Sequence, residues 1–231
     1  MLVLITGASK GIGFELTKLF ANNTNFLVLA VSRNTRTLQH LIKKSDCYNV
    51  LPIKADITIA AHQKKIATTI KALNTPLGIL INNAGEIVNK PFEKITAKEL
   101  YSVYNTNVFA PFTLIQHLIT LFSKSNAHIV NISSMGGFQG SAKFSGLSAY
   151  SSSKSALSGL TECLAEELKP KQIAVNCLAI GAVQTEMLNR AFPGYKAPLS
   201  AAQMAQFIFD FAQNGQRYFN GKILPVSSTT P

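Results

Sequence analysis

Residues 6–13 read TGASKGIG, and this stretch decides the fold. It follows directly on the apolar run LVLITG at residues 2–7, and a helix-length segment comes after it. The stretch contains three glycines, which permit a tight turn and a close approach of backbone N–H groups to a bound group: Gly7, Gly11 and Gly13. Because the N-terminus of a helix favours negative charge, the pattern predicts a loop that cradles the pyrophosphate of a dinucleotide.

Apolar runs of strand length alternate with helix-length segments along the rest of the chain. The runs are short, rich in Val, Ile and Leu and nearly unbroken, which is typical of strands covered on both faces, and they lie at 2–7, 26–32, 49–55, 78–84, 128–134, 173–179 and 222–227. Helices are predicted at 13–23, 59–73, 96–123, 150–168 and 200–213. Right-handed βαβ crossovers join such elements. We expect one α/β domain over residues 1–231, with a Rossmann-type doubly wound parallel sheet of about seven strands and helices on both faces.

Composition narrows the class of protein further. With 231 residues, 47% of them hydrophobic, the chain can bury one sizeable core. The net charge of +11 comes from scattered basic residues, which favours a phosphate-bearing ligand over nucleic acid or a membrane. No apolar run approaches the roughly 18 residues of a membrane span, and MLVLITG has no leader-like pattern, so we expect a cytoplasmic protein. The cysteines form no C-x-x-C pair and predict buried thiols in a reducing compartment rather than a disulfide framework or a metal site: Cys47, Cys163 and Cys177.

A tyrosine and a lysine stand four residues apart in SAYSSSKSALSGL, residues 148–160. On a helix this spacing places Tyr150 and Lys154 on one face, one turn apart. The pair is suited to acid/base chemistry. The alternative is a half-buried aromatic beside a solvated lysine.

Together these motifs resemble the ordinary, non-extended short-chain dehydrogenase/reductase family. The likeness runs from residue 2 to about residue 187 and keeps the family's order of elements: TGASKGIG at 6–13, NNAG at 82–85, NTNVFAPF at 105–112, VNISS at 130–134, Tyr150 with Lys154, and VNCLAIGAVQT at 175–185. The resemblance implies an oxidoreductase that moves a hydride between a nicotinamide cofactor and a small carbonyl or alcohol substrate. The substrate stays open among a ketone, an aldehyde and a 3-oxoacyl thioester.

The resemblance also implies four catalytic residues. Tyr150 would donate or accept the proton, and Lys154, with the positive ring of the oxidised cofactor, would favour the phenolate and bind the nicotinamide ribose. Ser134 would polarise the substrate oxygen, with Ser133 as the competing assignment. Asn107 would help to hold a water in the proton relay behind the lysine.

Cofactor preference is predicted at the end of the second strand, where the chain reads AVSRN. Ser32 stands where NAD-preferring relatives carry an acidic residue, and Arg33 follows. Arg33 and Lys10 resemble the basic positions of NADP-preferring members, so we expect NADP rather than NAD. Asp56 would contact adenine, and Val183 and Thr185 the carboxamide. The full cofactor set is Gly7, Ser9, Lys10, Gly11, Ile12, Gly13, Ser32, Arg33, Asp56, Ile57, Asn83, Ala84, Gly85, Tyr150, Lys154, Gly181, Val183 and Thr185.

Three segments depart from the family pattern. Ile180 replaces the usual proline before Gly181, which would loosen the wall beside the nicotinamide. The segment between Ser134 and Tyr150 is longer than in many relatives and would be shaped for a particular substrate. Residues 185–200 are predicted to form a short substrate lid.

Two other functions and an assembly remain open at this point. A non-catalytic NADP(H)-binding sensor or scaffold would keep the glycine loop without turnover. A serine acylase would use the S-x-x-K pattern in SSSK, residues 151–154, but S-D-N and K-T-G partners do not accompany it. The resemblance further implies a homodimer or homotetramer, formed through the helices at 96–123 and 150–168.

Overall fold

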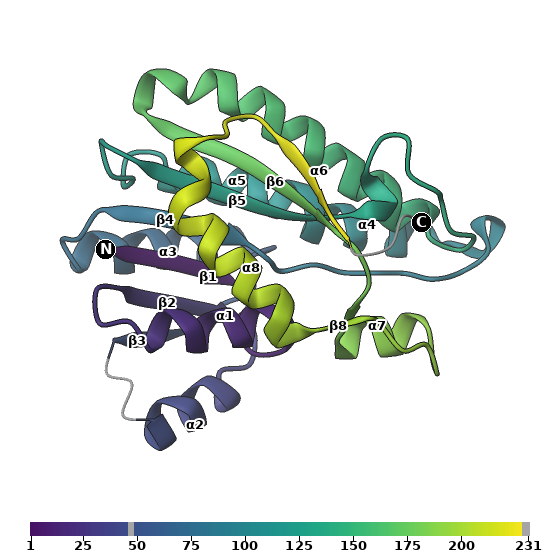
Figure 1. Cartoon of the computed structure of the whole chain (residues 1–231), viewed down its shortest axis with the longest axis horizontal. Helices are drawn as coiled ribbons and strands as arrows, with labels where there is room; N and C mark the ends of the chain where they lie inside the picture. Colours follow the sequence, from purple (N-terminus) through teal and green to yellow (C-terminus); the bar gives the residue numbers. More distant parts are fainter. Residues whose placement is uncertain (46–48, 228–231) are drawn as a thin grey trace.

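The computed structural model describes residues 1–45 and 49–227. Seven strands form one parallel sheet in the order β3-β2-β1-β4-β5-β6-β9 (Figure 1). Their bounds are Leu2–Thr6 for β1, Leu27–Ser32 for β2, Val50–Lys54 for β3, Leu77–Asn82 for β4, Ala127–Ser134 for β5, Ile173–Ile180 for β6 and Ile223–Val226 for β9. The chain starts in the middle of the sheet and winds outward in both directions, which confirms the predicted doubly wound fold.

The helices are α1 Gly11–Ala21, α2 Arg36–Ser45, α3 Ala60–Ala72, α4 Ala97–Tyr104, α5 Ala110–Leu118, α6 Ser148–Glu167, α7 Glu186–Ala191 and α8 Ala201–Asn214. Two of them, α2 and α7, were not expected from the sequence. The prediction of one continuous helix over residues 96–123 is wrong, because a π-helix at Asn105–Phe109 separates α4 from α5 and α5 ends at Leu118. Such π-helical turns often occur at functional sites.

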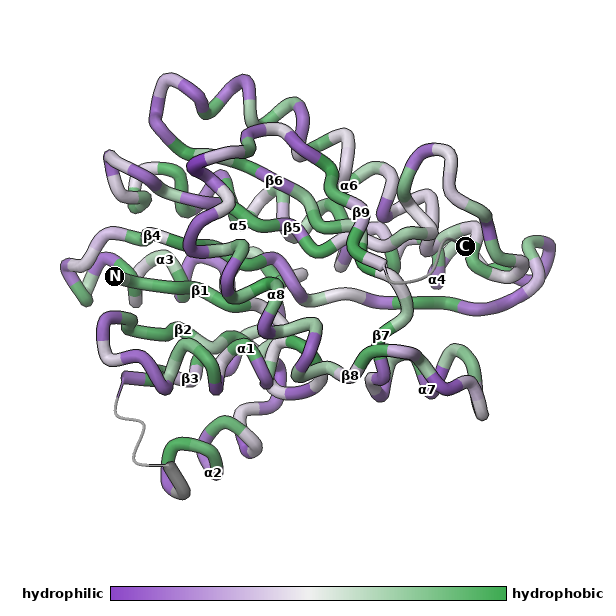
Figure 2. The backbone as a smooth tube through the Cα atoms, in the orientation of Figure 1, coloured by the Kyte–Doolittle hydropathy of each residue, from purple (hydrophilic) through white to green (hydrophobic). Residues whose placement is uncertain are grey.

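Two apolar layers hold the helices against the sheet. One contains residues of α3, α5 and α6, and the other contains residues of α1, α2 and α8. All five residues of β1 are buried, and Figure 2 shows hydrophobic colour along most of β1 and β2. Burial on both faces explains why these strands appear in the sequence as unbroken apolar runs.

Several features bear on the class of protein. Within residues 1–45 and 49–227, no helix is long and apolar enough to cross a bilayer. The same residues contain no group of three or more His, Cys, Asp or Glu side chains arranged to hold a metal ion. Cys177 is buried as expected, but the prediction of a buried thiol is wrong for Cys163, which is exposed on α6; Cys47 lies outside the described residues.

A buried histidine of β5 joins this strand to α8 and to β6. The Nδ1 atom of His128 lies 3.0 Å from the Ala212 carbonyl oxygen, and its Nε2 atom lies 3.0 Å from Nδ2 of Asn176. Two further hydrogen bonds fix the orientation of the Asn176 side-chain amide. Its Oδ1 atom accepts the Lys222 N–H, and its Nδ2 atom donates to the Phe219 carbonyl oxygen. Nδ2 of Asn176 therefore donates to His128, and the ring is neutral with its proton on Nδ1.

This neutral histidine predicts a loss of stability in acid. Burial lowers the pKa of His128 to about 4, against an opposing hydrogen bond to Ala212. The histidine takes up a proton near pH 6.5 in the unfolded chain but only near pH 4 in the folded chain. The free energy of unfolding is therefore at its full value above pH 6.5 and falls by about 3 kcal/mol as the pH drops towards 4. Urea unfolding at a series of pH values should show a shallower decline for His128→Gln, while the exposed control His40→Gln should match wild type. Equal slopes for wild type and His128→Gln would contradict the prediction.

Candidate active site

The loop between β1 and α1 has no space for side chains at two of its glycines. Gly7 has a φ of +67°, and a Cβ placed there would lie 2.9 Å from Cα of Ala84. A Cβ at Gly13 would overlap the Gly7 carbonyl oxygen. Only glycine fits both positions without a shift of the backbone.

The end of β4 is fastened to this glycine loop. The Thr6 hydroxyl accepts hydrogen bonds from the N–H groups of Asn83 and Ala84, each at 3.1 Å. The side chain of Asn83 donates to the carbonyl oxygens of Thr6 and Gly7, at 2.9 and 3.3 Å. Hydrogen bonds therefore hold the NNAG and TGASKGIG motifs together at the carboxyl edge of the sheet.

The start of α1 fits the phosphates of a dinucleotide. Lys10, at the N-cap, provides no side-chain cap, and the first turn of α1 contains no acidic residue. The backbone N–H groups that a helix leaves free at its N-terminus are thus not taken by a cap or opposed by negative charge. The Ser9 carbonyl accepts the hydroxyl of Thr37 at 2.8 Å, which ties α2 to the same loop, while Ile12 is buried beneath it.

The ends of β2 and β3 bring three of the predicted cofactor residues together. The Ser32 hydroxyl donates to the Asn34 carbonyl, and the Ser32 carbonyl accepts the Ala55 N–H at 3.0 Å. Arg33 is exposed beside Asp56. Burial raises the pKa of Asp56, but two hydrogen bonds from Thr58 and the Arg33 charge outweigh it and hold that pKa below its ordinary value. The neighbouring side chain of Ile57 is buried.

Ser134 and Tyr150 meet at the carboxyl end of β5. The Ser134 side chain lies close enough to the Tyr150 phenol to act on its pKa, and Oγ of Ser134 accepts the Gly136 N–H at 3.2 Å. Ser133 is buried instead and donates to the Lys154 carbonyl at 3.0 Å. The structure thus places Ser134, and not Ser133, beside the phenol.

Lys154 is buried one helical turn from Tyr150. Its side chain is 4% exposed, so the alternative of a solvated lysine is wrong. The Nζ atom lies 5.8 Å from the centroid of the Tyr150 ring and donates to the Ile132 carbonyl at 2.8 Å. Burial lowers the pKa of Lys154 to about 8, with an opposing effect of nearby Cys177.

The phenol behaves differently from the expectation. Burial raises the pKa of Tyr150 above its ordinary value, and the polar side chain of Ser134 only partly offsets this effect. The predicted lowering of this pKa is therefore not seen in the protein alone, because desolvation of the phenolate outweighs the favourable neighbours. At neutral pH Tyr150 keeps its proton.

Asn107 connects the end of NNAG to α6 from within the π-helix. Its side-chain oxygen accepts the Glu86 N–H at 2.8 Å, and its amide donates at 2.9 Å both to the Glu86 carbonyl and to the Ser153 hydroxyl. Ser153 in turn donates to the Tyr150 carbonyl at 2.7 Å. A Cβ on Gly85 would lie 3.5 Å from Asn107 Oδ1 and 3.6 Å from Lys154 Nζ, so these groups converge. Sequence reasoning missed Ser153, whose spacing of three residues from Tyr150 was its only signal.

The remaining predicted cofactor residues follow β6. Gly181 donates its N–H to the Val226 carbonyl at 2.9 Å, so β9 supports the wall where Ile180 replaces proline. Val183 is buried and pairs with Leu199 in a separate two-stranded sheet of β7, Val183–Gln184, and β8, Leu199–Ser200. Thr185 caps α7 by accepting the Leu188 N–H at 3.2 Å.

Lys10 is the predicted residue whose contact differs most from the expectation. Its ammonium group pairs with the carboxylate of Glu186 on α7 at 3.0 Å, rather than with a group at the end of β2. Sequence reasoning missed Glu186, because nothing local to residue 186 indicates a partner in the glycine loop.

The comparisons with known proteins agree with this architecture. Residues 1–196 match the family model described as short chain dehydrogenase. The 3-oxoacyl-[acyl-carrier-protein] reductase FabG of Chlamydia trachomatis is 26% identical over 96% of this chain and 94% of its own length, and L-xylulose reductase of Caenorhabditis elegans is 31% identical over 80% and 72%. A solved structure of ElxO with NADP bound is 26% identical, with a TM-score of 0.86 over 98% of this chain and 96% of that chain. The chain is therefore an oxidoreductase that belongs to the short-chain dehydrogenase family.

Proposed function

We propose that this chain is an NADP(H)-dependent oxidoreductase that reduces a carbonyl group, in a ketone, an aldehyde or a 3-oxoacyl group, to an alcohol, with Tyr150 as the proton donor. The observation that carries the proposal is the phenol of Tyr150 beside the Ser134 side chain, with the buried ammonium of Lys154 5.8 Å from the Tyr150 ring centroid. This group lies at the same edge of the sheet as the glycine loop, where α/β proteins bind their ligands.

The protonation states support a reductase that donates a proton. Tyr150 holds its proton at neutral pH because its pKa is raised, so the phenol can give that proton to the substrate oxygen as negative charge develops there. Ser134 would hydrogen-bond the same oxygen and fix its position. Lys154 is mostly charged below a pKa of about 8, so it stabilises the phenolate that donation leaves behind.

The nicotinamide cofactor, when bound, supplies the hydride. The glycine loop would hold the pyrophosphate, Asp56 and residues 83–85 the adenosine side, and Val183 and Thr185 the carboxamide. Lys154 still has two N–H groups for the ribose after its hydrogen bond to Ile132. Neighbours with this fold include ElxO with NADP and 4-hydroxyisoleucine dehydrogenase with NADH. Our choice of NADP rests on Ser32 in place of an acidic residue and on the charges of Arg33 and Lys10.

Replacing Arg33 should weaken NADPH binding by about ten- to a hundredfold. A charge-assisted contact to the 2′-phosphate is worth about 1.5–3 kcal/mol, and each 1.4 kcal/mol is a factor of ten. NADH lacks that phosphate and should hardly change. The measurement is the ratio of kcat/KM for NADPH and NADH in wild type, Arg33→Ala and Ser32→Asp/Arg33→Ala, where the double variant repels the phosphate and should prefer NADH. A wild type that already prefers NADH, or an equal loss for both cofactors, would show that Arg33 is only a surface charge.

Turnover tests the proposal against its non-catalytic alternative. The names of the relatives give a 3-oxoacyl-[acyl-carrier-protein] and L-xylulose as carbonyl compounds reduced by similar proteins. NADPH oxidation should therefore be followed with a panel of ketones, aldehydes, ketoses and 3-oxoacyl thioesters. Turnover with one class supports the reductase and names its substrate. Tight NADPH binding without turnover of any of them would instead support an NADP(H)-binding sensor or scaffold.

We further propose that the protein works in the cytoplasm as one domain over residues 1–231, with residues 185–200 as the substrate lid and a homodimer or homotetramer as its assembly. Large apolar side chains on α4, the π-helix and α5 support an interface there, because they are exposed in the isolated chain: Leu100, Tyr101, Phe109 and Phe112. Light scattering after size-exclusion chromatography would test the assembly, and a monomer would contradict it.

A further inference from the structure

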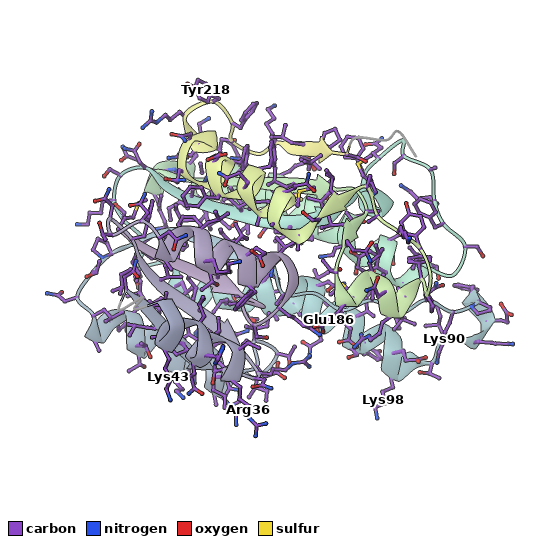
Figure 3. The ribbon with its side chains drawn as sticks, turned by 60° about the horizontal axis from the view of Figure 1, so that its bottom comes forward. Arg36, Lys43, Lys90, Lys98, Glu186 and Tyr218 are labelled. Atoms are coloured by element: carbon purple, nitrogen blue, oxygen red, sulfur yellow. The ribbon has the colours of Figure 1, made fainter. Side chains whose placement is uncertain are left out.

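The helix α7 lies across the carboxyl edge of the sheet and carries an acidic residue towards the glycine loop. Oε2 of Glu186, its first residue, accepts a hydrogen bond from Nζ of Lys10 at 3.0 Å. Figure 3 shows Glu186 at the end of α7 nearest the N-terminal elements. The two side chains remain half or more exposed, at 52% for Lys10 and 70% for Glu186, so a ligand can reach the ammonium group.

Contacts at both ends of α7 fix the position of Glu186. At its start, Cγ2 of Thr185 lies 3.3 Å from the place that a Cβ on Gly11 would take. At its end, the side chain of Asn89 donates to the Ala191 carbonyl at 2.7 Å. Since α7 is held against the glycine loop on one side and the loop after β4 on the other, the carboxylate stays within reach of Lys10.

We propose that Glu186 is a specificity-determining residue that competes with the 2′-phosphate of NADP(H) for Lys10. The inference rests on the proposed function, in which NADP is the cofactor and Lys10 one of its phosphate contacts. A phosphate monoester carries close to two negative charges at neutral pH. The 2′-phosphate can bind Lys10 only if it displaces the Glu186 carboxylate from the ammonium group. The negative charge of that carboxylate also repels the phosphate. NADH carries no 2′-phosphate and leaves the pair intact.

Removing the carboxylate should then favour one cofactor only. Exposed ion pairs are weak, so Glu186→Gln should tighten NADPH binding by about two- to fivefold and leave NADH nearly unchanged. The readout is the dissociation constant from fluorescence titration of each reduced cofactor, which needs no substrate and no turnover. Glu15→Gln is the matched control, because it also removes one negative charge and breaks a carboxylate–lysine pair, with Lys18 at 2.7 Å, on α1.

A double-variant cycle shows whether the effect passes through Lys10. Lys10→Met should weaken NADPH binding, and adding Glu186→Gln to it should give no further gain. A gain that persists without Lys10, a gain equal to that of Glu15→Gln, or no gain at all would overturn the inference. A loss of affinity for both NADPH and NADH in Glu186→Gln would also overturn the inference, because the ion pair would then help to hold the bound dinucleotide in place.

The same titrations separate this inference from the cofactor assignment. If wild type binds NADH as tightly as NADPH, the assignment of NADP fails and the role of Glu186 falls with it. If wild type prefers NADPH and Glu186→Gln leaves that preference unchanged, the assignment stands and only the role of Glu186 is overturned.

Discussion

Tyr150→Phe is expected to lower kcat for carbonyl reduction by about a hundred- to ten-thousandfold, while the affinity for NADPH stays close to that of wild type. The substitution removes one hydroxyl group and leaves the half-buried ring in its place on α6. That hydroxyl holds the transferable proton and lies beside Ser134, so the loss falls on the chemical step. Single-turnover kinetics and a fluorescence titration with NADPH give the two quantities.

Tyr104→Phe is the matched control for this experiment, because Tyr104 is also a half-buried tyrosine on a helix, at the end of α4. It should retain turnover. Wild-type-like turnover in Tyr150→Phe would end the proposed role of the phenol, and a large loss of NADPH affinity would show that the hydroxyl serves binding instead.

Lys154→Met is expected to lower kcat/KM by about a thousandfold and to weaken both NADPH and NADH. The variant loses the charge that stabilises the phenolate and the N–H groups proposed for the ribose, which both cofactors share. Methionine fills a similar apolar volume, so the packing of the stem is retained. Activity and cofactor affinity should therefore fall together, unlike in Tyr150→Phe.

The pH profile gives a second test of Lys154. Its charged form dominates below the pKa of about 8, so wild-type reduction should decline as the pH rises through that value. In Lys154→Met this decline should be absent or displaced. Lys98→Met, at an exposed position of α4, is the control and should keep the wild-type profile. Unchanged cofactor affinity and an unchanged profile in Lys154→Met would contradict the role of Lys154.

The sheet was predictable because its central strands, β1 and β4, are buried along their whole length, and a strand that is buried on both faces appears in the sequence as an unbroken apolar run. The helix α2 was missed because it is mostly polar, and Leu38 is its one residue that is fully buried among the side chains described. The π-helix at Asn105–Phe109 was missed because its residues fit a continuous helical pattern. Its position depends on Asn107, which bonds to Glu86 and Ser153 outside the helix.

The sequence by itself determined the features that depend on a short piece of backbone. The glycine loop needs a positive φ at Gly7, and the spacing of Tyr150 and Lys154 is fixed by the helical repeat. Only the tertiary structure decided that Ser134 rather than Ser133 meets the phenol, and that Lys154 is buried with a lowered pKa. The ion pair of Lys10 and Glu186, which are 176 residues apart, is likewise seen only in the tertiary structure. Desolvation and contact across the sheet depend on how distant segments pack, and no local pattern of residues specifies them.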